Sequence, residues 1–207
     1  MVKVKVCGLT RPEDVSAVNE CHPDWAGFVF APSRRQVTAE RAAALIAVLA
    51  PGIVPVGVFV DVPVDEVAQT ALQCGLGAVQ LHGGEDGAAL AALRARLPGS
   101  VAIWKAVRVR GGEDIARAAA LGADLLLLDA WSADAAGGTG QVFDWRLAAG
   151  LEVPFLLAGG LHPGNVAEAI AAVRPYGVDV SSGVESDGRK DREKIVAFVQ
   201  RARSVNP

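Results

Sequence analysis

Cys7 and Asp129 are the side chains best suited to moving protons in this sequence. Cys7 ends an apolar, β-branched run, and Gly8 after it would leave the thiol open to a ligand. A lone cysteine is more often a small buried hydrophobic residue, so its position is what favours a function. Asp129 follows four leucines, where a carboxylate seldom occurs without a partner or a function. A thiolate base and a carboxylic acid facing each other would suit an isomerisation by proton transfer.

Two segments rich in glycine and serine have the composition of a phosphate site. The first contains Gly159 and Gly160, and the second contains Ser181, Ser182 and Gly183. Small residues before a helix expose backbone N–H groups to an anion, and the helix dipole adds positive potential. One Gly-Gly pair alone is more often a tight turn. Two such segments in adjacent structural units favour phosphate.

Eight apolar segments recur along the chain and must position these residues. Strands are expected at residues 2–7, 25–30, 54–60, 78–82, 101–107, 124–129, 154–158 and 178–181. Their starts lie 23 to 30 residues apart, which leaves room for one helix and two loops between parallel strands. The intervening segments have helical periodicity. Thr38 is expected to cap the second helix, and Pro163 is expected in the first turn of the seventh.

This repeated unit predicts an α/β fold, a (β/α)8 TIM barrel formed as a single domain by residues 1–207. An open doubly wound sheet is the alternative, but it rarely contains eight equal units. Active sites of such barrels lie at the carboxyl ends of the strands, where the residues named above are expected. Asp61 and Arg108 are expected as ion-paired residues at the same rim.

Composition and charge exclude several classes of protein. The 207 residues carry a net charge of −3 without a stripe of Lys or Arg, so nucleic acid is not an expected partner. Charged residues, Gly or Pro interrupt every apolar stretch before about 18 residues, and the N-terminus has no signal core, so a cytoplasmic protein without a membrane span is expected. The three cysteines lack metal-binding spacing, so no metal is expected, and Cys21 and Cys74 are assigned to packing.

Much of the chain resembles the phosphoribosylanthranilate isomerase family. The matching segments are residues 5–10, 27–30, 33–37, 79–83, 128–129, 137–140, 143–145, 157–161, 165–166 and 179–185. No single segment is decisive, but their joint order and spacing are highly specific. The resemblance extends from residue 3 to about residue 191, nearly the whole chain.

The resemblance implies an Amadori rearrangement in tryptophan biosynthesis. The substrate would be N-(5-phosphoribosyl)anthranilate, and the product 1-(2-carboxyphenylamino)-1-deoxyribulose 5-phosphate. By the same resemblance, Cys7 would be the general base and Asp129 the general acid. Arg35 would hold the anthranilate carboxylate, and the glycine and serine segments would hold the phosphate. No metal or organic cofactor is implied.

Some assignments stay open within this resemblance. The family often has proline where this chain has Arg34, so Arg34 could share or take the carboxylate role. His82 could be a neutral donor in the pocket or could orient neighbouring backbone. Asp179 could contact the anthranilate nitrogen or organise the eighth loop, and residues 137–140 could cover the substrate or merely link elements. The expected partner is a small phosphosugar, and both a monomer and a homodimer are compatible with the sequence.

Three other functions are compatible with the same fold. A histidine-pathway or dual-substrate sugar isomerase would have Asp where this chain has Cys7. A phosphosugar lyase or synthase would need a lysine inside the barrel, and Lys105 in the fifth strand is the candidate. A non-catalytic phosphate-binding module would keep the two phosphate segments but would have no need for both Cys7 and Asp129.

Overall fold

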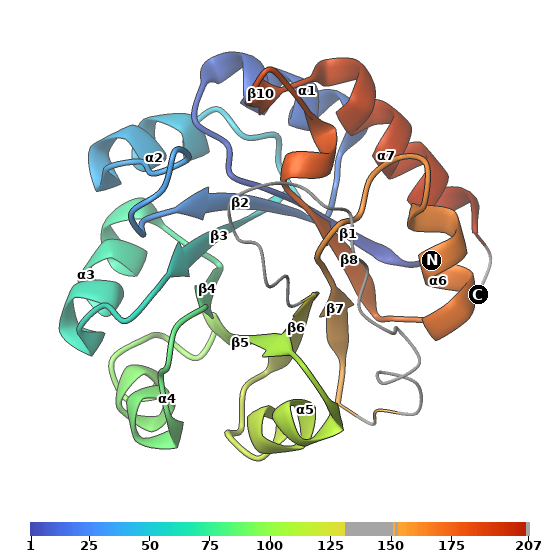
Figure 1. The fold of residues 1–207 in the computed structure, drawn as a ribbon. Coiled ribbons are helices and arrows are strands. Elements are labelled where there is room, and N and C mark those ends of the chain that lie inside the picture. The colour runs from blue at the N-terminus through green and yellow to red at the C-terminus, as the bar shows by residue number, and fades with distance from the viewer. Residues whose placement is uncertain (131–150, 152, 206–207) are drawn as a thin grey trace.

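Eight parallel strands close into a barrel in the order β1 to β8 (Figure 1). The computed structural model describes residues 1–130, 151 and 153–205. The strands are β1 (Lys3–Cys7), β2 (Trp25–Val29), β3 (Val54–Phe59), β4 (Ala78–Leu81), β5 (Ala102–Val109), β6 (Leu125–Ala130), β7 (Phe155–Leu157) and β8 (Gly177–Val180). The predicted (β/α)8 barrel is therefore confirmed.

Helices surround the barrel on its outside (Figure 1). They are α1 (Pro12–Cys21), α2 (Ala39–Ile46), α3 (Val64–Cys74), α4 (Gly87–Arg94), α5 (Gly112–Ala119), α6 (Val166–Val173) and α7 (Arg192–Ser204). The helix expected between β6 and β7 falls outside the described residues. No helix among the described residues is long and apolar enough to cross a membrane.

The two predicted helix starts have different outcomes. Thr38 caps α2 as expected, because its hydroxyl accepts a hydrogen bond from the backbone N–H of Arg41 at 3.2 Å. Pro163 does not lie in the first turn of α6, because that helix begins three residues later. The preceding turn is held instead by Asn165, whose side chain accepts from His162 N and donates to Gly160 O.

Alternation along the strands divides the core into two parts. Inside the barrel, a cluster contributed mainly by strand residues includes Val56, Trp104, Leu127 and Leu156. The larger cluster includes the alternate strand residues, such as Ile103, together with the apolar faces of the helices. The inward-facing residue nearest the carboxyl end of each strand therefore lies at that end of the barrel.

A short hairpin follows β8 and was not foreseen from the sequence. A 3-10 turn, η2 (Ser182–Val184), leads into β9 (Glu185–Ser186), which pairs with antiparallel β10 (Arg189–Lys190). The two residues between them, Asp187 and Gly188, both have positive φ, at 50° and 75°. Asp-Gly is a favoured pair for such a two-residue turn. The hairpin brings the side chains at its two ends to the rim of the barrel.

We expect the packing of α7 on the barrel to contribute strongly to stability. Phe198 is fully buried, so Phe198→Ala should lower the free energy of unfolding by about 3–5 kcal/mol. Urea denaturation measures this change. Leu72→Ala on α3 is the control, because Leu72 is 56% exposed and its loss should cost no more than about 0.5 kcal/mol. Equal effects of the two substitutions would contradict this account of the core.

Candidate functional site

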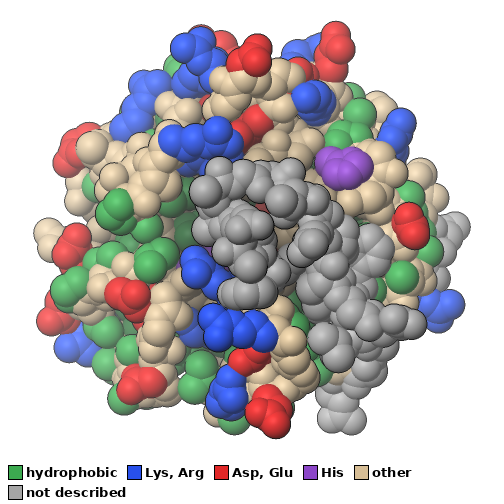
Figure 2. Space-filling model, viewed as in Figure 1, with side chains coloured by type: hydrophobic (Ala, Val, Ile, Leu, Met, Phe, Trp, Pro, Cys, Tyr) green, Lys and Arg blue, Asp and Glu red, His purple; other side chains and the backbone are tan. Residues whose placement is uncertain are grey.

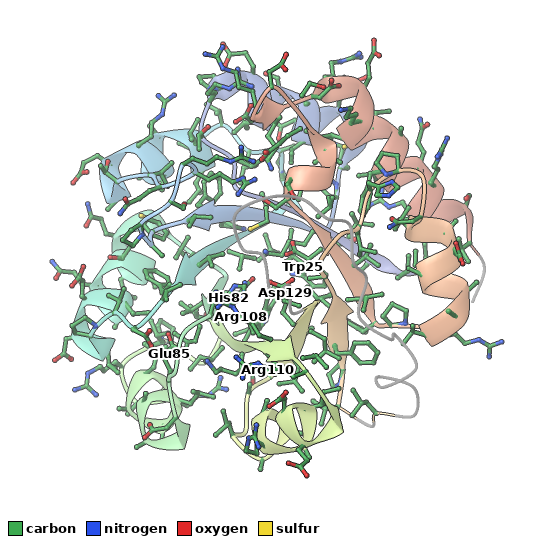
Figure 3. All side chains as sticks on the ribbon, viewed as in Figure 1. Trp25, His82, Glu85, Arg108, Arg110 and Asp129 are labelled. Atoms are coloured by element: carbon green, nitrogen blue, oxygen red, sulfur yellow. The ribbon has the colours of Figure 1, made fainter. Side chains whose placement is uncertain are left out.

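The carboxyl ends of the strands hold most of the residues singled out by sequence. Cys7 is the last residue of β1, and Asp129 lies one residue from the end of β6. Figure 3 shows His82, Arg108 and Asp129 close together near the centre of the barrel, with Glu85 and Arg110 farther out. Figure 2, in the same view, shows Lys and Arg side chains around the centre of this face.

Two glycines near Cys7 leave room for neighbouring side chains, Gly27 for the thiol and Gly8 for Arg35. Cys7 is 7% exposed. A Cβ on Gly27 of β2 would lie 2.7 Å from Cys7 Sγ, so a side chain there would displace the thiol. Gly8 has φ 83°, and a Cβ on it would lie 2.4 Å from Arg35 Cδ. Gly8 therefore makes the turn out of β1 and lets the Arg35 side chain lie across it.

A buried ion pair lies below Cys7 inside the barrel. Lys5 faces the same side of β1 as Cys7 and is fully buried, and its Nζ lies 3.0 Å from Asp179 Oδ1 of β8. Burial, the largest influence, lowers the pKa of Lys5, but the attraction of Asp179 and Cys7 outweighs it, so the pKa is raised. Asp179 is thus part of a strand and holds an ammonium group beside the thiol.

Two opposing influences act on the Cys7 thiol. Burial raises its pKa and is the largest influence, while the nearby ammonium groups of Lys5 and Lys190 lower it. The net effect raises the pKa of Cys7 above its ordinary value. The thiolate is therefore a strong base that is scarce at neutral pH.

Asp129 is near a histidine that a buried amide orients. The Nε2 atom of His82 lies 3.5 Å from Asp129 Oδ2, and the Asp129 side chain is 30% exposed. The Nε2 atom of Gln80, a residue 2% exposed, lies 3.3 Å from His82 Nδ1. If that amide donates, the proton of neutral His82 is on Nε2 and points toward Asp129. Gln80 Oε1 is buried without a hydrogen-bond partner among the described residues.

The two glycine and serine segments lie against each other. A Cβ on Gly183 would lie 1.9 Å from Leu161 O, so the loops after β7 and β8 pack directly on each other. Gly159 and Gly160 have φ of 82° and 66°. Within the described part of the chain, their backbone N–H groups have no protein acceptor. Such N–H groups can bind an anion.

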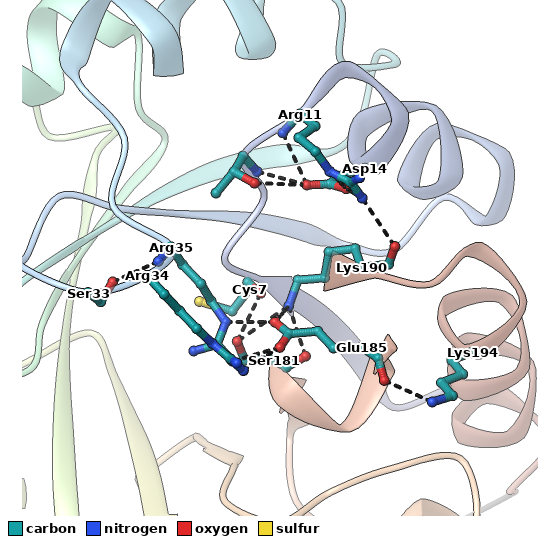
Figure 4. A network of polar contacts seen from close by, with 11 residues as sticks. Cys7, Arg11, Asp14, Ser33, Arg34, Arg35, Ser181, Glu185, Lys190 and Lys194 are labelled. Atoms are coloured by element: carbon teal, nitrogen blue, oxygen red, sulfur yellow. Dashed lines mark hydrogen bonds and ion pairs between the residues drawn. The ribbon is translucent and has the colours of Figure 1, made fainter. Parts of the chain in front are cut away.

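Arg34 and Arg35 both bind a carboxylate that the sequence analysis did not single out (Figure 4). Arg35 donates from Nε and Nη2 to the two oxygens of Glu185 at 2.6 and 2.9 Å, and Arg34 donates from Nη2 at 2.6 Å. Lys190 donates to Glu185 Oε1 at 2.8 Å and to Ser181 O at the same distance. Both Glu185 and Lys190 lie on the hairpin after β8.

The ion pairs expected of Asp61 and of Arg108 are not found among the described residues. Asp61 accepts a hydrogen bond from Gly84 N at 2.6 Å, so it organises the loop after β4. Arg108 lies within β5, which extends further than predicted, and its Cα is opposite that of Asp129. Among the described residues Arg108 makes no ion pair.

Lys105 points away from the interior of the barrel. Its neighbours in β5, Trp104 and Ala106, belong to the interior cluster, so alternation turns Lys105 outward. Its Nζ lies 2.6 Å from both Glu85 Oε2 and Gly83 O, and so it secures the loop after β4. All three cysteines are free. The described residues contain no cluster of His, Cys, Asp and Glu able to hold a metal ion. The loop at residues 137–140 lies outside the described residues.

Comparisons with known proteins agree with one another. The family described as N-(5′-phosphoribosyl)anthranilate (PRA) isomerase matches residues 4–201. The N-(5′-phosphoribosyl)anthranilate isomerase of Acetivibrio thermocellus is 46% identical over 100% of this chain and 98% of its own. The solved phosphoribosyl anthranilate isomerase of Thermotoga maritima is 38% identical, with a TM-score of 0.90 over 99% of this chain and 100% of its own. Another solved isomerase, in complex with reduced 1-(o-carboxyphenylamino)-1-deoxyribulose 5-phosphate, is 35% identical, with a TM-score of 0.83 and the same coverage.

The raised pKa of Cys7 predicts slow alkylation at neutral pH. In a variant carrying Cys21→Ser and Cys74→Ala, the rate of reaction with iodoacetamide should rise about tenfold per pH unit up to that pKa, because the thiolate reacts. The same protein unfolded in urea is the control, since its exposed thiol has an ordinary pKa and should react at lower pH. A fast rate that does not change between pH 6 and 9 in the folded protein would contradict this electrostatic picture.

Proposed function

The chain belongs to the N-(5′-phosphoribosyl)anthranilate isomerase family of tryptophan biosynthesis, and we propose that Cys7 and Asp129 are the general base and general acid of its reaction. The observation that carries this assignment is their position. Both are inward-facing at the carboxyl ends of barrel strands, β1 and β6, where active sites of this fold lie. Of the two, Cys7 has cations beside it, which favour a thiolate.

Asp129 begins the reaction by opening the sugar ring. Its carboxylic acid proton is transferred to the furanose ring oxygen, and the bond between that oxygen and carbon 1 breaks. The lone pair of the anthranilate nitrogen moves into a double bond with carbon 1, giving an iminium ion. The ring oxygen leaves as a hydroxyl group on carbon 4. His82 contacts the carboxyl group that performs this step, and so we assign it to positioning Asp129.

Cys7 completes the rearrangement. Its thiolate removes the proton on carbon 2, and the electrons of that C–H bond form a double bond between carbons 1 and 2. The iminium electrons return to the nitrogen, which gives an enolamine. The enolamine tautomerises to the ketone, because a proton leaves the oxygen on carbon 2 and one is added to carbon 1. Lys5 stabilises the thiolate, and Asp179 holds Lys5 in place; a contact from Asp179 to the anthranilate nitrogen stays a prediction.

Two anion sites would hold the ends of the substrate. We assign the phosphate to the backbone N–H groups and hydroxyl groups of the loops after β7 and β8, at Gly159, Gly160, Ser181, Ser182 and Gly183. We assign the anthranilate carboxylate to Arg35, whose side chain lies across Gly8 next to Cys7. The phosphosugar bound in the solved isomerase supports a ligand with both groups.

The alternative functions have less support. A lyase would need a lysine inside the barrel, but Lys105 points outward and Lys5 is ion-paired with a raised pKa, which makes it a poor nucleophile. A histidine-pathway isomerase would have Asp where Cys7 stands. A phosphate-binding module would not need both Cys7, with its neighbouring lysines, and Asp129.

We expect loss of either catalytic group to lower kcat by about two to four orders of magnitude. The variants are Cys7→Ala and Asp129→Asn, with Cys21→Ala and Asp65→Asn as controls that should keep full activity. The assay follows the loss of substrate fluorescence, with substrate made in situ from anthranilate and phosphoribosyl pyrophosphate by a transferase. A near-full rate in Cys7→Ala or Asp129→Asn would refute the role assigned to that residue.

Loss of the Arg35 guanidinium should chiefly weaken substrate binding. The contact is remote from the proton transfers, so Arg35→Ala should raise KM by about tenfold to a hundredfold, the worth of a charge-assisted hydrogen bond, with a smaller change in kcat. The same fluorescence assay measures both constants. A fall in kcat at unchanged KM would instead assign the contact to the transition state.

A further inference from the structure

Glu185 is a buried carboxylate at the rim that the reaction steps above do not use. Its side chain is 5% exposed and contacts three cations, Arg34, Arg35 and Lys190 (Figure 4). Burial, the largest influence, raises the pKa of Glu185, but the hydrogen bonds from Arg35 and Lys190 outweigh it and lower the pKa. The residue is therefore a fixed negative charge.

The contact between Glu185 and Arg35 fixes the plane of the guanidinium. Glu185 takes Nε and Nη2, which form the side edge of the group. The other edge, formed by Nη1 and Nη2, keeps N–H donors for a second planar carboxylate, since a guanidinium has five. Arg35 is 21% exposed, and its stem lies across Gly8. It is thus oriented at both its stem and its head.

The charge balance of this cluster favours an incoming anion. One carboxylate faces three cations, so the group has an excess of two positive charges before substrate binds. Arg34 contributes a single hydrogen bond and is 58% exposed, while Arg35 contributes two and is largely covered. Arg35 is therefore held more firmly than Arg34.

We propose that Glu185 is a positioning residue that makes the isomerase selective for substrates carrying a carboxylate, by holding the Arg35 guanidinium with its free edge available to that group. The inference rests on the proposed role of Arg35. Lys190 connects Glu185 to the rest of the site. It donates to both Glu185 and Ser181, and the Ser181 hydroxyl donates to Cys7 O at 3.1 Å. Glu185 thereby links the carboxylate end of the site to the phosphate loop and to the strand end that bears the base.

The test compares two stable ligands that differ in one group. The first is reduced 1-(o-carboxyphenylamino)-1-deoxyribulose 5-phosphate, and the second is the same molecule with a plain phenylamino ring. Isothermal titration calorimetry gives both Kd values. The Kd of the phenylamino ligand divided by the Kd of the carboxyphenylamino ligand measures carboxylate selectivity. In Glu185→Gln the ratio should fall about tenfold, mainly through weaker binding of the carboxylate ligand. Equal weakening of both ligands, with the ratio unchanged, would assign Glu185 a general structural role and overturn the proposal.

Matched variants separate the possible failures. Glu20→Gln is the control. Both carboxylate oxygens of Glu20 accept hydrogen bonds from an arginine, Arg192, as those of Glu185 do from Arg35, and loss of this contact should leave the Kd ratio unaltered. Glu185→Asp keeps the charge but is one methylene shorter, so it should also lower the ratio and serves if Glu185→Gln does not fold. Arg35→Ala should abolish the selectivity.

The outcomes distinguish this inference from the proposed role of Arg35. If Arg35→Ala keeps the ratio, Arg35 does not read the carboxylate and both ideas fail. If Arg35→Ala makes the two Kd values equal while the Glu185 variants keep the wild-type ratio, the positioning role of Glu185 alone is overturned. Tighter binding of the carboxylate ligand by Glu185→Gln would mean that Glu185 competes with substrate for Arg35, which also overturns the proposal.

Discussion

The ion pair between Lys5 and Asp179 is the constraint on which the site depends. The two residues are directly opposite in the register that closes β1 onto β8, so the pair forms only when the barrel is closed. Leaving either ion alone in that interior would cost about 3–5 kcal/mol. The pair therefore ties the closure of the barrel to the electrostatics of Cys7, two residues farther along β1, since an ammonium group remains beside the thiol only while Asp179 neutralises it.

Polar contacts around the rim extend this order to the loops. Lys105 and Glu85 secure the loop after β4, from which His82 faces Asp129. Glu185 and Lys190 secure the loop after β8 and join it to Arg35 and to the backbone of Cys7 through Ser181. Each proposed chemical group is thus supported by a neighbouring ion pair or hydrogen bond. Three of these ion pairs are buried, namely Lys5 with Asp179, Lys105 with Glu85 and Lys190 with Glu185. The rim is preorganised before any ligand arrives.

The fold was predictable from sequence, but the support of the site was not. Regular spacing of apolar runs indicated the barrel, residue type and position at strand ends indicated Cys7 and Asp129, and the family resemblance added Arg35. Lys5 and Gln80 escaped notice because their roles depend on the direction in which a strand residue points and on partners in other strands, as with Asp179. The role of Gly27 is to leave space for the Cys7 thiol, which depends on how closely β1 and β2 pack in three dimensions. The hairpin after β8 did have a local signal, the Asp187-Gly188 pair, and reading it would have brought Glu185 and Lys190 together.

The hairpin also separates two kinds of evolutionary change. The groups proposed for proton transfer are on barrel strands, whose substitution disturbs the interior. The residues that orient Arg35 are on a short excursion between β8 and α7, outside the barrel ladder. On the roles proposed above, an insertion or a new turn that keeps Lys190 beside Cys7 would alter which substituent is recognised while the groups on the barrel strands stay in place. Ligand preference in this enzyme can therefore drift through one exchangeable surface segment, and the scaffold can keep a single reaction while its range of acceptable molecules changes.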